Sequence, residues 1–175
     1  MELSDDMLKK EIKFKYDCAK GKIEKMAEKN LMIKESFNLA VQNHQKNNLE
    51  VAKNLYKNIL KIKPDHVAAI NNLASIFKGT GDNQKAISYY KKAIEMQPTY
   101  VTGYYNLAII LGELNHISEA KKYFEKGLNL DPNNKKICNG YGKILLKLNQ
   151  HIKGLEYIRK GSGLIRFTNT DFKII

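Results

Sequence analysis

The sequence predicts an all-helical protein built from stacked pairs of helices. The first observation behind this prediction is a period, because near copies of the tetrapeptide at residues 71–74 begin at Phe37 and Tyr105, each 34 residues away. The second is that Pro64, Pro98 and Pro132 repeat at the same spacing. The third is composition: 43% of the residues are hydrophobic, tryptophan is absent, and few apolar runs alternate as strands do.

Each 34-residue unit contains two amphipathic segments separated by a turn. In the second unit, four apolar residues share one helical face: Ile70, Leu73, Ala74 and Phe77. The turn at residues 78–83 is followed by a second apolar set: Ala86, Tyr90, Ala93 and Ile94. Pro98 ends the unit, because the residue before a proline avoids the helical region. Such a helix pair cannot bury its apolar face alone, so we expect neighbouring units to bury it jointly.

This pattern resembles the tetratricopeptide repeat (TPR) family. The resemblance implies a right-handed αα-superhelix with good repeats at 33–66, 67–100 and 101–134, and a degenerate C-terminal repeat at 135–166. Where the family has glycine between the two helices, this chain has Gly81 once and asparagine otherwise, at positions 47, 115 and 149. Asparagine is the next best residue at a positive φ, so we expect the turn to be retained.

The two ends of the chain lie outside the predicted array at 33–166. Residues 1–32 predict an N-terminal capping helix, with a stripe of apolar residues at spacings of three and four: Leu8, Ile12, Tyr16, Ala19, Ile23 and Met26. The alternative for this stripe is a coiled-coil seam that forms a homo-dimer. Residues 167–175 are an apolar C-terminal tail, which either folds over the last helix or docks onto a partner.

Composition argues against several classes of function. The formal charge of +12 includes +7 from residues 135–175, but lysine greatly outnumbers arginine, so we do not expect a nucleic-acid partner. Cys18 and Cys138 are far apart, and the four histidines show no ligand spacing, so we expect no metal and no cofactor. No catalytic motif is present, and we predict no enzyme activity. We expect no membrane segment and a cytoplasmic location.

Asparagines in phase with the repeat are the candidate ligand contacts. In the TPR family the first helix of each pair lines a groove, and its stripe here carries Asn38, Asn72 and Asn106. This ladder resembles that of the TPR region of O-linked N-acetylglucosamine transferases, which implies that the amides hold a peptide backbone. The neighbouring residues complete the predicted peptide-binding set: Phe37, Asn71, Tyr105 and Asn139. The alternative is that asparagine here serves helix packing only. The carboxylate clamp of chaperone-binding TPR domains is a poorer match, because Phe37, Val41 and Thr102 replace its polar residues.

We therefore predict a non-enzymatic TPR scaffold that binds an extended peptide or a partner protein in its groove. The alternative is an accessory substrate-recognition subunit of a protein-modifying enzyme, such as a glycosyltransferase or a hydroxylase. A weaker alternative is nucleic-acid binding through the basic C-terminal unit.

Overall fold

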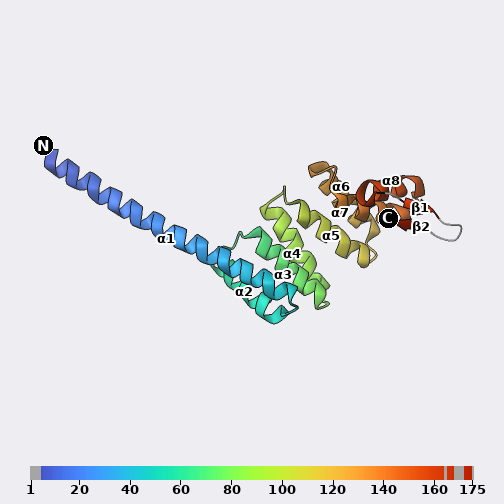
Figure 1. The fold of residues 1–175 in the computed structure, drawn as a ribbon, viewed down its shortest axis with the longest axis horizontal. Coiled ribbons are helices and arrows are strands. Elements are labelled where there is room, and N and C mark those ends of the chain that lie inside the picture. Colours follow the sequence, from blue (N-terminus) through green and yellow to red (C-terminus); the bar gives the residue numbers. More distant parts are fainter. Residues whose placement is uncertain (1–4, 164, 168–171, 175) are drawn as a thin grey trace. The chain divides into compact units, whose positions relative to one another are not determined.

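The structure, a computed structural model, describes residues 5–163, 165–167 and 172–174 (Figure 1). The chain divides into two units, residues 1–64 and 65–175. The first unit contains α1 (Asp5–Gln45) and α2 (Leu49–Ile62). The second contains α3 (Val67–Gly79), α4 (Asn83–Met96), α5 (Val101–Glu113), α6 (Ile117–Leu130), α7 (Lys135–Lys147) and α8 (His151–Ser162), followed by strands β1 (Ile165–Phe167) and β2 (Phe172–Ile174).

In the first unit, α2 packs against the C-terminal part of α1. Ile33 and Ala40 of α1 are buried, as are Ala52, Tyr56 and Ile59 of α2. The ring of Phe37 lies 5.9 Å from that of Tyr56, and the His44 imidazole meets the same tyrosine edge-on at 6.2 Å. Burial lowers the pKa of His44, which favours its neutral form in this contact.

Helix α1 runs without a break through residue 32 into the first repeat. The N-terminal part of α1 extends beyond α2 (Figure 1). Three residues of the predicted apolar stripe are exposed: Tyr16, Ile23 and Met26, at 67%, 68% and 65%. Gly21 does not interrupt the helix.

The second unit confirms the predicted stack of antiparallel helix pairs. Helices α3 and α4, α5 and α6, and α7 and α8 pair, and α4 packs on α5 as α6 packs on α7. One core runs through the pairs, and the residues predicted from the period lie in it: Ala74, Ala86, Tyr90, Leu107, Ala108, Ala120, Phe124 and Tyr141. Leu107 is buried in this core, whereas its equivalent Leu39 in the first unit is 49% exposed.

The four inter-helix turns adopt the predicted left-handed conformation. Asn47, Gly81, Asn115 and Asn149 have φ of 62°, 84°, 63° and 59°. At the third turn, the backbone N–H of His116 donates to the Leu111 carbonyl at 2.8 Å, which satisfies a carbonyl at the helix end. The sequence thus places a residue that tolerates positive φ at the point where each chain reversal requires it.

We expect Asn115→Ala to lower the free energy of unfolding by about 1 kcal/mol, because a Cβ-bearing residue without a local hydrogen-bonding side chain disfavours this conformation. Asn115→Gly should match or slightly exceed the parent protein. Urea denaturation of the three proteins measures this order. An alanine variant as stable as the glycine variant would contradict it.

The C-terminal repeat has both of its helices, α7 and α8. Helices α7 and α8 bury Ile137, Tyr141, Leu145 and Ile158, although this repeat departs most from the pattern. Beyond α8, β1 and β2 form an antiparallel hairpin in which Ile165 faces Ile174. Of the segment predicted as an apolar tail, Phe167 and residues 172–174 lie in these strands. Whether its apolar side chains cover the last helix lies outside what the structure describes. No described helix is both long and apolar enough to cross a bilayer.

Candidate functional site

The first helices of the second unit are linked to one another by polar side chains. Each link joins a residue to the one 35 positions later: Asn71 to Asn106 at 2.9 Å, Lys78 to Glu113 at 2.8 Å, and Gly112 to Lys147 at 3.4 Å. Helices α3, α5 and α7 therefore present neighbouring faces. We call this the first-helix face, and it comprises half-buried and exposed residues: Ala68, Asn72, Ser75, Thr102, Asn106, Ile109, Lys136 and Lys143.

Three of the predicted asparagines form a hydrogen-bonded chain on this face. Asn106 Nδ2 donates to Asn71 Oδ1 at 2.9 Å, and Asn71 Nδ2 donates to Asn72 Oδ1 at 3.3 Å. Asn71 is only 4% exposed, whereas Asn72 and Asn106 are half-buried. The sequence predicted Asn72 and Asn106 as equal rungs and Asn71 as a neighbour. In the structure, Asn71 is the buried link that orients the other two amides.

The first unit carries the remaining members of the N-terminal set. Asn38 is exposed on α1, and Phe37 is half-buried against Tyr56. Part of the Phe37 ring is therefore buried in the packing of α1 against α2. Asn38 lies in the other unit from the hydrogen-bonded chain.

The last repeat breaks the ladder for a steric reason. A Cβ on Gly140, the fourth position of the ladder, would lie 2.6 Å from the ring of Phe124. The ring of Phe124 also contacts Tyr105, at 6.4 Å between centroids. Beside Gly140, the Oδ1 atom of Asn139 is buried and has no hydrogen-bond partner within the described part of the chain. Asn139 lies against α8, because a Cβ on Gly161 would approach the Asn139 Cβ to 3.0 Å.

Two features of the first-helix face were missed by the sequence reasoning. Ser75 Oγ shares a hydrogen bond of 3.0 Å with the hydroxyl of Tyr90, whose pKa is raised by burial. Lys78 is paired with Glu113, so its charge is largely compensated. The ion pair could have been found by comparing residues 35 apart instead of 34. A side chain on one first helix contacts the residue that follows its own equivalent on the next first helix.

The face is therefore most basic over the last repeat. Lys136, Lys143 and Lys147 are exposed on α7, and a single hydrogen bond from Lys147 to a backbone carbonyl leaves its charge in place. An acidic segment of a ligand would be favoured there.

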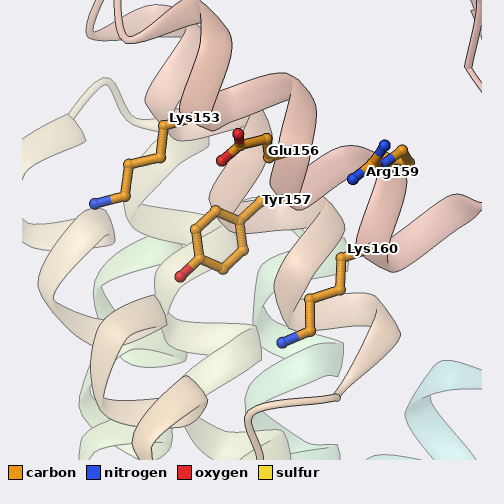
Figure 2. Close-up of a pocket in the computed structure, with 5 residues that line it drawn as sticks. All are labelled: Lys153, Glu156, Tyr157, Arg159 and Lys160. Atoms are coloured by element: carbon orange, nitrogen blue, oxygen red, sulfur yellow. The ribbon is translucent and has the colours of Figure 1, made fainter.

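A separate hollow of about 560 Å³ lies along α8. Figure 2 shows its lining side chains, with Tyr157 between Lys153 and Lys160, and with Glu156 and Arg159 on the same helix. Tyr157 meets the buried ring of Tyr141 edge-on at 4.8 Å. The hollow has three cationic side chains and one carboxylate. If the basic C-terminal unit bound nucleic acid, as the weaker alternative holds, the phosphates would be expected to lie here.

The histidines have structural or exposed positions. His66 Nδ1 accepts a hydrogen bond from the backbone of Ala69 at 3.2 Å and caps α3. His116 lies 3.6 Å from Glu119 at the start of α6, and His151 is exposed. Within the residues that the structure describes, no three metal-ligating side chains gather at one point.

The stacked helix pairs and the open first-helix face define a helical-repeat protein of the αα-solenoid class. Residues 67–100 and 101–134 each match the family model for the tetratricopeptide repeat. The chain therefore contains tetratricopeptide repeats, and its fold is a TPR solenoid.

Solved structures of TPR solenoids are similar to this chain in fold. MamA from the AMB-1 strain is 20% identical, with a TM-score of 0.60 over 75% of this chain and 72% of its own. The first TPR domain of Spaghetti (RPAP3), bound to an HSP90 peptide, is 22% identical, with a TM-score of 0.63 over 67% and 93%. An O-GlcNAc transferase mutant of Thermobaculum terrenum is 19% identical, with a TM-score of 0.68 over 75% of this chain and 26% of the transferase. No curated protein sequence matches the chain.

Proposed function

We propose that the protein is a non-enzymatic scaffold that binds an extended peptide segment of a partner protein along its first-helix face. The observation that carries the proposal is the chain of amides from Asn106 through Asn71 to Asn72. Each primary amide has two donor hydrogens and an acceptor oxygen. Asn106 uses one donor within the chain, so its carbonyl oxygen can accept from a peptide N–H. Such contacts recognise the peptide backbone rather than a particular side chain.

Two further observations support this function. The lysines of α7 favour a ligand that is acidic where it passes the last repeat. The RPAP3 domain, which is similar in fold, was solved with an HSP90 peptide. For the present chain we propose a ligand recognised mainly through its backbone.

The test is a screen of a displayed library of unstructured peptides against the full chain, followed by affinity measurement for each binder. Combined Asn72→Ala and Asn106→Ala substitutions should weaken binding by about five- to one-hundredfold, because each lost hydrogen bond contributes about 0.5–1.5 kcal/mol.

A matched control removes two exposed asparagines from second helices, through Asn58→Ala and Asn129→Ala. This control should keep the parental affinity. If every binder kept its affinity in the first-helix variant while that variant stayed folded, the amides would not be the ligand contacts.

A further inference from the structure

The exposed stripe of α1 lies on the same helix face that packs against α2. Tyr16, Ala19, Ile23 and Met26 are spaced by three, four and three residues, and the same spacing continues through the polar Asn30 to Ile33, Phe37, Ala40 and His44. The second group packs on α2, as the buried Ile33 and Ala40 and the ring contacts of Phe37 and His44 show. We call the first group the α1 seam. It is the uncovered continuation of a surface that already binds a helix.

The α1 seam opens into a hollow where α2 ends. This hollow, of about 470 Å³, has Met26, Ile33 and Ile62 in its lining together with lysines 22, 25, 29 and 63. The exposed apolar residues from Tyr16 to Met26 are therefore bordered by cations, and Asn30 separates them from the buried Ile33 in the lining of the hollow. All of these residues belong to the first unit.

The charges beside the α1 seam select the partner. The heptad that the seam defines has two flanking positions, which occur six times between residues 13 and 29. Five of these six residues are lysines, at 13, 15, 20, 22 and 29, and the sixth is Ala27. The acids Asp17, Glu24 and Glu28 lie outside these positions. In a parallel pairing of two copies, Lys15 of one would face Lys20 of the other and Lys29 would face Lys34, whereas Lys22 would face Ala27. An antiparallel pairing joins like flanking positions, so lysine would again meet lysine. The repulsion disfavours the homo-dimer that the apolar spacing alone had suggested.

We propose that the α1 seam is a docking surface for an amphipathic helix of another protein whose flanking positions are acidic. Its apolar residues pack on Tyr16, Ala19, Ile23 and Met26, in line with α2. Its carboxylates pair with flanking lysines such as Lys20, Lys22 and Lys29. This surface is a second binding site, separate from the first-helix face and chemically different from it.

The probe is a synthetic peptide of about three heptads with leucine at the seam positions and glutamate at the flanking positions. The control peptide replaces each glutamate by lysine. In a fluorescence anisotropy titration of the full chain at low salt, the acidic peptide should bind at least tenfold more tightly than the basic one. Added salt should reduce that preference.

Two matched variants locate the binding on α1. Ile23→Ser with Met26→Ser should weaken binding of the acidic peptide at least tenfold, and circular dichroism should show that the chain stays folded, because both side chains are already exposed. Asp17→Ser with Glu28→Ser, on the other side of the helix, should leave binding intact. Neither pair touches the first-helix face, so the library screen for the peptide function is independent of this result.

Three outcomes would overturn the proposal. Equal affinity for the two peptides would show that the lysines do not select the partner. A dimer in sedimentation velocity that dissociates in the Ile23→Ser and Met26→Ser variant would identify a second copy as the occupant. Binding to vesicles of phosphatidylserine and phosphatidylcholine that is lost in the same variant, without binding of the acidic peptide, would assign the seam to a membrane surface.

Discussion

Replacing Phe124 by alanine should lower the free energy of unfolding of the second unit by about 3–5 kcal/mol. The Phe124 side chain is 1% exposed, lies at the centre of the core, and contacts the rings of Tyr105 and Tyr141. Its removal leaves a cavity between α5, α6 and α7 that the helices cannot close, because their backbones are held by the flanking pairs. The loss should therefore include a cavity cost as well as the lost transfer free energy.

Urea denaturation measures this loss, and hydrogen exchange shows where it acts. Because each repeat contacts only its neighbours, protection should fall first in α5 to α8. Tyr123→Ala is the matched control, since the adjacent tyrosine on the same helix is half-buried and should cost less. Equal losses for the two variants would contradict the central position assigned to Phe124.

Replacing Gly142 by alanine should lower the free energy of unfolding by at least about 2 kcal/mol, although alanine is the better helix former by about 1 kcal/mol. A Cβ on Gly142 would lie 2.6 Å from the carbonyl oxygen of Gly154 and 2.7 Å from Ile158 Cγ1. The carbonyl belongs to the backbone of α8, so relief requires that α7 and α8 move apart.

Gly21→Ala is the control for this change. Nothing lies within 4 Å of a Cβ on Gly21, which is also inside a helix. This substitution should raise helix stability by about 0.5–1 kcal/mol. If Gly142→Ala also stabilised the protein, the two helices would not need the close approach that the structure shows. The same denaturation series measures both variants.

The two proposed surfaces would bind different structural features of a partner. The first-helix face offers amides, which suit the exposed backbone of an extended segment. The α1 seam offers a narrow apolar strip between lysines, which suits the side of a folded helix. A scaffold with both surfaces can hold two partners, or two segments of one partner, without competition between them.

Much of the fold could be predicted from the period of the sequence. A 34-residue spacing of small, aromatic and proline residues specifies where each helix packs and where each pair ends. The asparagines at 47, 115 and 149 and Gly81 specify the chain reversals, because few other residues tolerate their positive φ. These features are local or strictly periodic, so one sequence is enough to find them.

The ends of the array and the polar links depended on the tertiary structure. Leu39 fits the core pattern but is half exposed in the first unit, whereas its equivalent Leu107 is buried in the second. The period placed Asn72 and Asn106 on one face, but it could not show that Asn71 joins them, since that bond depends on how far α5 is displaced along α3. It also could not show that the ring of Phe124 closes the ladder at Gly140. The sequence determined which residues repeat, and the packing of each helix on its neighbour decided which of them remain available to a partner.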